Sequence, residues 1–220
     1  MQHELRTFDD ATALAAAAAT YVAECARVAQ SRGATFTFAL SGGKSPWAMF
    51  ESLAHDDVDW AATRIYQVDE RVVREDSDAR NLKSLRAALK GTNAPIEAMD
   101  VEADDLEVAC TNYAALLPES FDLVHLGVGP DGHCASLVPG DPVLDVTDRL
   151  VALSGPYQDT MRMTLTYPAL ARANQLLWLI SGEDKRDALA KLLANDPSIP
   201  AGRVVAGASL IMADRAALGQ

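Results

Sequence analysis

The sequence predicts an α/β fold, a three-layer Rossmann-like arrangement in which a mostly parallel sheet carries helices on both faces. Short β-prone apolar runs alternate along the chain with segments of helical periodicity, and polar clusters follow four of the runs. Such alternation is typical of a parallel sheet covered on both faces. No repeat, low-complexity tract or linker divides the 220 residues, and this length suits one well-buried domain. We therefore expect a single domain over residues 1–220.

The N-terminal part of the chain predicts a helix, a strand and a second helix. Apolar residues recur at steps of three and four over residues 9–30, which marks one buried face of a helix. The run ATFTFAL at residues 34–40 is β-prone, and we expect the first strand of the sheet to begin near Ala34. Pro46 suits the first turn of a helix that continues to about residue 54.

The same reasoning predicts the remaining elements. A strand is expected at residues 63–68, then a polar turn from Asp69 and a helix at residues 78–89. Residues 91–103 and 140–142 are expected to be loops. Further strands are expected at residues 123–127, 161–165, 176–181 and 204–212, with a helix at residues 183–194. Because such sheets bind ligands beyond the carboxyl ends of their strands, the polar clusters after residues 40, 68, 126 and 180 are the candidate functional segments.

Composition excludes several classes of function. The formal net charge of −12 disfavours nucleic acid and anionic membranes as partners, since both attract basic surfaces. No segment is apolar and long enough to span a bilayer, and the N-terminus lacks the features of a signal peptide. Three cysteines without a C-x-x-C pair favour a reducing compartment. We therefore expect a cytoplasmic protein, a monomer or small homo-oligomer, that acts on a small molecule.

The first polar cluster is the turn SGGKSP at residues 41–46. Small residues allow backbone N–H groups to approach an anion, and the start of a helix adds a favourable dipole. A P-loop is excluded because the Walker spacing would place glycine at position 38, which is Phe38. The cluster by itself fits either an anion-binding turn or a tight structural turn.

The second and fourth clusters are charged. The run DER at residues 69–71 follows a strand directly, with Arg80 and Asn81 on the next helix. It fits either a solvated charge run or a ligand site, because three charges at this edge are costly without a partner. In the fourth cluster, Lys185 lies in the first turn of a helix, where a cation opposes the helix dipole. It fits either phosphate binding or free solvation, and Arg162 is a further cation in a strand-like segment.

The third cluster, GVGPDGHCASL at residues 127–137, has several interpretations. Its glycines match a dinucleotide-binding turn, but prolines at positions 139 and 142 stop the crossover helix that such a turn opens, and Pro130 removes an N–H donor. Cys134 and His133 do not form a nucleophile pair, because adjacent residues point in different directions. Asp131 and His133 have no third ligand at a familiar metal spacing. A general acid/base pair remains, with the carboxylate orienting the imidazole or a water.

Taken in order, these clusters resemble the 6-phosphogluconolactonase family, within a superfamily that includes glucosamine-6-phosphate deaminase. The matching pieces are SGGKSP at 41–46, DER at 69–71, GVGPDGHCASLVPG at 127–140 and the strand-turn-lysine element ending at Lys185. The GPDGH-x-ASL-x-P element is the specific one. The resemblance implies one catalytic domain that hydrolyses 6-phospho-D-glucono-1,5-lactone to 6-phosphogluconate in the oxidative pentose phosphate pathway. This reaction is a carboxylic ester hydrolysis, and the family needs no metal or other cofactor for it.

The resemblance also implies roles for individual residues. His133 would activate water with support from Asp131, and Arg71 would stabilise the developing oxyanion. The predicted catalytic residues are His133, Asp131, Arg71 and Asp69. The predicted substrate and phosphate contacts are Ser41, Gly42, Gly43, Lys44, Ser45, Arg80, Asn81, Gly132, Arg162 and Lys185. Lys44 departs from the family, which often has a small hydroxyl residue there, and Arg80 stands where the family often has serine.

Two other functions compete with lactone hydrolysis. Amino-sugar phosphate deaminases typically continue the histidine loop with Asn-Glu-Pro, whereas SLVP at residues 136–139 contains no acid. They also tend to have tyrosine in place of Arg71. A sugar-phosphate-sensing module would need a separate DNA-binding unit, and the chain before Ala34 leaves room for only one helix. These differences favour lactone hydrolysis.

Overall fold

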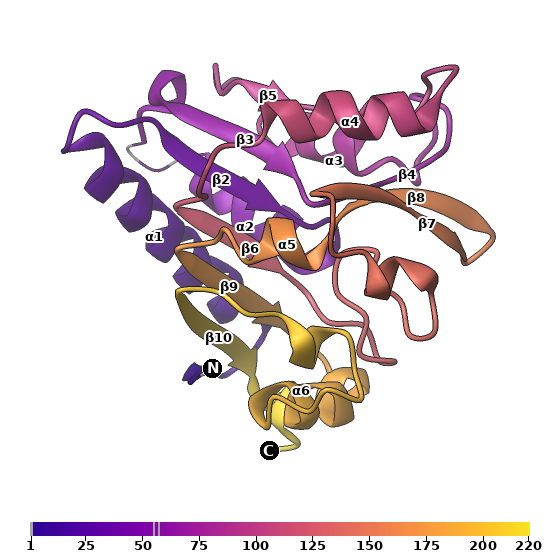
Figure 1. Cartoon of the computed structure of the whole chain (residues 1–220). Coiled ribbons are helices and arrows are strands. Elements are labelled where there is room, and N and C mark those ends of the chain that lie inside the picture. The colour runs from indigo at the N-terminus through magenta and orange to yellow at the C-terminus, as the bar shows by residue number, and fades with distance from the viewer. Residues whose placement is uncertain (1, 55, 57) are drawn as a thin grey trace.

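The computed structural model describes residues 2–54, 56 and 58–220. Its larger sheet has seven strands in the order β1, β10, β9, β6, β2, β3, β5 (Figure 1). All neighbouring strands of this sheet pair in parallel. The strands are β1 (Glu4–Phe8), β2 (Phe36–Leu40), β3 (Thr63–Gln67), β5 (Ile96–Glu97), β6 (Leu123–Leu126), β9 (Gln175–Ile180) and β10 (Ala208–Asp214).

Helices cover both faces of this sheet, which confirms the predicted three-layer α/β architecture. In β9, Leu177 and Leu179 join the core on one face, whereas Leu176 and Trp178 join the core on the other. This alternation follows from the two-residue period of a strand, and it explains why strands buried on both faces are continuously apolar. The core that contains Leu177 and Leu179 includes α1 (Ala11–Gln30), α2 (Lys44–Leu53) and α3 (Asn81–Ala88). The core that contains Leu176 and Trp178 includes α4 (Leu106–Leu116), α5 (Tyr167–Leu170), α6 (Arg186–Leu193) and α7 (Arg215–Leu218).

The strand order reverses between β2 and β6. From β2 the chain continues to β3 and β5 on one side, and from β6 it continues to β9 and β10 on the other. The loops that follow β2 and β6 therefore diverge and leave a crevice between them, which is where ligands bind in open α/β sheets. These loops contain the SGGKSP and GVGPDGHCASL segments.

A second, antiparallel sheet contains β4 (Asp69–Arg71), β8 (Thr160–Leu165) and β7 (Val151–Tyr157), in the order β4-β8-β7. Figure 1 shows the β7–β8 hairpin beyond the carboxyl ends of β2 and β3. The predicted polar turn at Asp69 is wrong, since residues 69–71 form a strand. The strand predicted at residues 161–165 is confirmed, but it pairs in this antiparallel sheet and not in the main one.

The structure also contains elements that the sequence pattern did not predict. The first strand is β1 (Glu4–Phe8), which begins well before Ala34 and pairs in parallel with β10. Its residues are mostly exposed, so it lacks the apolar signal of a buried strand. The predicted loop at residues 91–103 includes β5, and α4 and β7 were not expected. The helix predicted at residues 183–194 is confirmed as a 3-10 turn, Glu183–Lys185, that leads into α6.

Within the described ranges, no helix combines the length and apolar character needed to cross a bilayer. The three cysteines are free thiols.

Candidate active site

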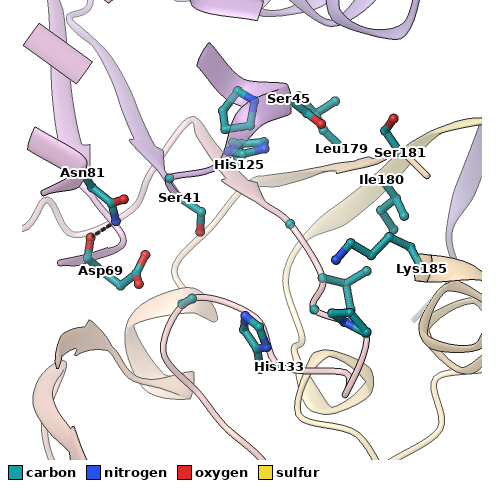
Figure 2. A pocket seen from close by; sticks show the side chains of 18 of the residues that line it. Ser41, Ser45, Asp69, Asn81, His125, His133, Leu179, Ile180, Ser181 and Lys185 are labelled. Atoms are coloured by element: carbon teal, nitrogen blue, oxygen red, sulfur yellow. Dashed lines mark hydrogen bonds between the residues drawn. The ribbon is translucent and has the colours of Figure 1, made fainter. Parts of the chain in front are cut away.

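A cavity of about 600 Å³ lies at the crevice between the β2 and β6 loops (Figure 2). The second sheet and the turn after β9 complete its walls. Four polar clusters that are far apart in the sequence therefore meet at one place, as the position of each after a strand predicted. The predicted site residues that line the cavity are Ser41, Gly42, Gly43, Ser45, Asp69, Arg71, Asn81, His133, Arg162 and Lys185.

His133 and Asp131 are in direct contact. The Nδ1 atom of His133 lies 2.6 Å from Oδ1 of Asp131. Burial raises the pKa of the Asp131 carboxyl, but hydrogen bonds and the charge of His133 lower it more, so its pKa lies below the ordinary value. The ionised carboxylate accepts a hydrogen bond from Nδ1, which assigns the ring proton to Nδ1. The Nε2 atom has no hydrogen-bond partner among the residues that the structure describes, so its lone pair is free to accept a proton.

Glycines in the loop after β6 make this contact possible. A Cβ atom on Gly129 would lie 2.0 Å from Nδ1 of His133, so the imidazole occupies the space of a side chain at position 129. Gly132 has φ of 84°, a left-handed conformation that favours glycine. No crossover helix follows these glycines, because the next helical element is a 3-10 turn that begins at Pro142. Gly129 therefore makes room for the imidazole, and Gly132 supplies the turn conformation.

The alternation of β4 divides the DER run between two environments. Asp69 and Arg71 line the cavity, whereas Glu70 between them is completely buried on the other side. The carboxylate of Glu70 accepts hydrogen bonds from the backbone N–H groups of Asn81 and Leu82 at 2.8 Å each. Glu70 thus caps the start of α3 and fixes that helix against the site.

Arg71 and Asn81 are hydrogen-bonded to each other in the lining of the cavity. The guanidinium of Arg71 donates to Oδ1 of Asn81 at 2.8 Å, and the amide of Asn81 donates to the backbone carbonyl of Asp69 at 3.1 Å. A Cβ atom on Gly42 would lie 2.1 Å from Oδ1 of Asn81. Glycine at position 42 is therefore required for the amide to reach this place.

A buried ion pair joins β8 to β4. Arg162 is 5% exposed, and its Nη1 atom lies 3.9 Å from Oδ2 of Asp69. Burial lowers the pKa of Arg162, while the neighbouring Asp69 carboxylate acts in the opposite direction. Asp69 also accepts a hydrogen bond from the hydroxyl of Ser136 at 2.7 Å. Ser136 belongs to the ASL part of the specific motif, so this motif contributes a partner for Asp69 as well as the histidine.

The loop after β2 and the turn after β9 also line the cavity. Gly43, with φ of 135°, begins α2 without any side-chain cap, so N–H groups of the first turn remain available to an anion. Lys185 lines the same cavity, and its Nζ atom lies 2.9 Å from a carboxylate oxygen of Asp184. The carboxylate of Asp214 accepts hydrogen bonds from Ser181 and from the backbone N–H of Gly182, which holds the lysine turn in place. The side chain of Lys44 lies outside the described part of the chain.

Two predicted substrate contacts have other surroundings. Arg80 is buried outside the cavity lining, where its Nε atom lies 3.6 Å from Glu70 and its Nη1 atom donates to the carbonyl of Val73 at 2.9 Å. The assignment of Arg80 to the substrate is corrected, because its guanidinium faces a buried carboxylate. Gly132 likewise does not line the cavity, since it packs against Ile199, where a Cβ atom would lie 2.5 Å from that side chain.

The cavity includes residues that the sequence did not single out. Tyr157 and Gln158, at the tip of the β7–β8 hairpin, line it beside His133. Their signal was hidden because Gly155 and Pro156 interrupt the β-prone run that precedes them. Cys134, by contrast, is a packing residue: it is completely buried, and burial raises the pKa of its thiol.

Comparison with known proteins identifies relatives of the whole chain. A family model described as glucosamine-6-phosphate isomerases/6-phosphogluconolactonase matches residues 9–212. A 6-phosphogluconolactonase of Mycobacterium tuberculosis is 33% identical over 228 residues, which cover 93% of this chain and 92% of that protein. A crystal structure of a 6-phosphogluconolactonase from Shewanella baltica has a TM-score of 0.87 at 26% identity, covering 97% of this chain and 98% of that one.

A likeness in fold extends to an enzyme of different activity. A monomeric glucosamine-6-phosphate deaminase has a TM-score of 0.87 at 17% identity and covers 98% of this chain and 99% of its own. The fold alone therefore does not separate a lactonase from a deaminase, and the site must do so. The match over residues 9–212 and the M. tuberculosis relative establish that the chain belongs to the glucosamine-6-phosphate isomerase/6-phosphogluconolactonase family.

Proposed function

We propose that the chain hydrolyses 6-phospho-D-glucono-1,5-lactone to 6-phosphogluconate, the lactonase step of the oxidative pentose phosphate pathway. One observation carries the proposal. The His133 imidazole has its Nδ1 atom on the Asp131 carboxylate, and it lines a cavity that also contains Arg71, Arg162 and Lys185. A base with one free nitrogen beside clustered cations suits water attack on an anionic ester.

The proposed reaction begins with proton transfer from water to Nε2 of His133. The water oxygen bonds to the lactone carbonyl carbon, and the carbonyl electron pair moves to the oxygen, where the Arg71 guanidinium stabilises the charge. The intermediate then collapses, the bond from this carbon to the ring oxygen breaks, and Nε2 returns its proton to that oxygen. The carboxylate of Asp131 supports the imidazolium between these two transfers. Side chains handle each proton and charge, so the proposal includes no metal or other cofactor.

The phosphate of the substrate is assigned to the uncapped start of α2 and to the ammonium of Lys185. The loop before α2 and Lys185 both line the cavity, which supports this assignment. Asp69, Asn81 and Arg162 are assigned to the sugar hydroxyl groups and ring. Free thiols and a net charge of −12 support a cytoplasmic enzyme of small molecules.

Deamination of an amino-sugar phosphate is less well supported by this site. The position that would carry an additional acid falls in residues 136–139, where Ser136 is instead buried and bonded to Asp69. The position of the tyrosine that deaminases tend to have carries Arg71.

A paired assay tests the choice. Freshly prepared 6-phosphogluconolactone and glucosamine 6-phosphate are offered separately in the presence of EDTA, with acid release and ammonia as readouts. We expect acid from the lactone alone, and H133A to lower turnover far more than substrate affinity. Ammonia from the second substrate, or equal lactone turnover by wild type and H133A, would contradict the proposal.

A further inference from the structure

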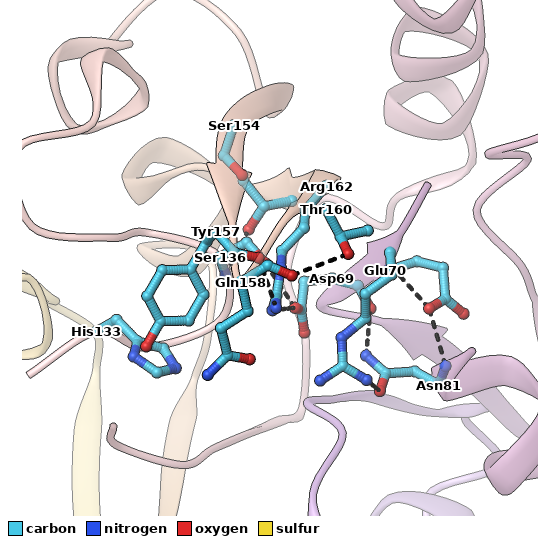
Figure 3. A network of polar contacts seen from close by, with 12 residues as sticks. Asp69, Glu70, Asn81, His133, Ser136, Ser154, Tyr157, Gln158, Thr160 and Arg162 are labelled. Carbon is cyan, nitrogen blue, oxygen red and sulfur yellow. Dashed lines mark hydrogen bonds and ion pairs between the residues drawn. The ribbon is translucent and has the colours of Figure 1, made fainter. Parts of the chain in front are cut away.

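The β7–β8 hairpin brings an aromatic ring against the histidine of the cavity. Tyr157 is the last residue of β7, and its ring centroid lies 5.0 Å from that of His133, with an angle of 59° between the ring planes. Figure 3 shows the tyrosine ring directly beside the imidazole. This separation and tilt fall in the range that aromatic pairs prefer, so the two rings pack against each other.

Two other contacts limit where this imidazole lies, but they leave it free to rotate about one axis. Asp131 holds Nδ1 at 2.6 Å, and the backbone of Gly129 leaves room for the ring edge, since a Cβ there would lie 2.1 Å from Cε1. A single hydrogen bond fixes a distance and permits rotation about its own axis. A flat neighbour that packs against the ring removes that rotation.

We propose that Tyr157 is a positioning residue that fixes the orientation of the His133 imidazole, so that Nε2 is directed into the cavity. This inference rests on the proposed function, in which Nε2 is the base. The aromatic ring carries this role, and the hydroxyl interacts with the Asp131 carboxylate. Partial burial, the negative charge of Asp131 and a hydrogen bond to its side chain raise the pKa of Tyr157, so the phenol stays neutral and does not compete as a base.

The hairpin holds Tyr157 in place. Gln158 and Asp159 have φ of 52° and 61°, the conformation of a two-residue hairpin turn whose twist matches the strands, and Tyr157 pairs with Thr160 across it. The guanidinium of Arg162 lies over the tyrosine ring at 5.1 Å from its centroid. Because Arg162 is buried against Asp69, the tyrosine is anchored to the protein interior.

The test compares two variants that remove the ring, Y157L and Y157I, with Y157F, which keeps the ring and loses the hydroxyl. D159N is the matched control, since Asp159 is exposed in the same turn and does not line the cavity. With freshly prepared lactone, we expect Y157L and Y157I to lower kcat by roughly ten- to a hundredfold, the order of loss that a small misplacement of a reacting group causes. Their KM is expected to change little, D159N is expected to keep wild-type kcat, and Y157F is expected to lose far less kcat than Y157L and Y157I.

Nuclear magnetic resonance relaxation of the His133 ring separates positioning from general damage. In wild type and Y157F the ring signals are expected to report one fixed orientation. In Y157L and Y157I they are expected to report exchange between orientations, at an unchanged thermal unfolding midpoint. Ring-less variants with wild-type kcat and a single fixed orientation would overturn the inference, and so would Y157F as slow as Y157L. If the wild type does not hydrolyse the lactone, the proposed function fails, and the ring-orientation measurement still decides the positioning role.

Discussion

Replacing Asp131 with asparagine tests the central contact of the proposed mechanism. The 2.6 Å separation between Oδ1 of Asp131 and Nδ1 of His133 is typical of a charge-assisted hydrogen bond. Asparagine has the same shape, but its amide carries no charge to support an imidazolium. Its NH2 group can also turn toward Nδ1, which would move the ring proton to Nε2 and block the base.

The structure sets the size of the effect. A hydrogen bond to a charged group contributes about 1.5–3 kcal/mol. The side chain of Asp131 is 38% exposed, so solvent screens the interaction and the lower end of that range applies. A loss of about 1.5 kcal/mol in the transition state corresponds to a roughly tenfold lower kcat. Burial raises the pKa of Asp131 but His133 lowers it more, so the carboxylate is ionised throughout neutral pH. The loss is therefore expected at pH 8, where the carboxylate is ionised.

The assay measures kcat on freshly prepared lactone with the spontaneous rate subtracted. D148N is the control, because Asp148 is an exposed aspartate that does not line the cavity. The reasoning is refuted if D131N retains the wild-type kcat at pH 8.

Three further predictions follow from other contacts. G129A should lower kcat by roughly a hundredfold, because its Cβ must displace the His133 imidazole. The control is G127A, where a Cβ meets nothing within 4 Å, and it should lose much less kcat. Equal losses in the two variants would contradict the argument. K185A should raise KM by roughly tenfold or more with little change in kcat, because it removes one charged contact to phosphate. K191A, at an exposed lysine, should leave KM unchanged. An unchanged KM in K185A would remove Lys185 from the phosphate site. His125 is completely buried, and burial lowers its pKa from 6.5 to about 3. The unfolded chain therefore binds the proton first as pH falls below 6.5, so this group is expected to cost about 2 kcal/mol of unfolding free energy at pH 5. In urea unfolding, the free energy of unfolding of H125L should fall less between pH 7 and pH 5 than that of the wild type. The same fall in both proteins would contradict the prediction.

The sequence specified the main sheet well because its strands carry a strong local signal. The runs at residues 34–40, 123–127 and 176–181 are apolar on both sides, as parallel strands buried between two layers must be. The exposed strand β1 and the proline-containing strand β7 lack that signal. The position of β1 depends on pairing with β10, which is far away along the chain, whereas β7 pairs with β8 across a two-residue turn.

The residues of the site likewise divide into those with a local sequence signal and those whose surroundings depend on long-range pairing. The motif alone identified His133 and Asp131, because two residues separated by one glycine are close enough along the chain for their contact to be predicted from the sequence. It did not show that Glu70 faces away from the cavity, because the strand character of residues 69–71 comes only from pairing with β8. The misassignment of Arg80 has the same origin, since its buried partner is Glu70.

The sequence by itself determined the α/β class, the four polar clusters and the pairing of Asp131 with His133, because each depends on neighbours along the chain. Tertiary structure alone decided which side chains share the cavity, and it brought Tyr157 to His133. Such contacts join segments whose separation in sequence carries no information about their distance in space. They form only when the carboxyl ends of β2, β6 and β9 meet the β7–β8 hairpin.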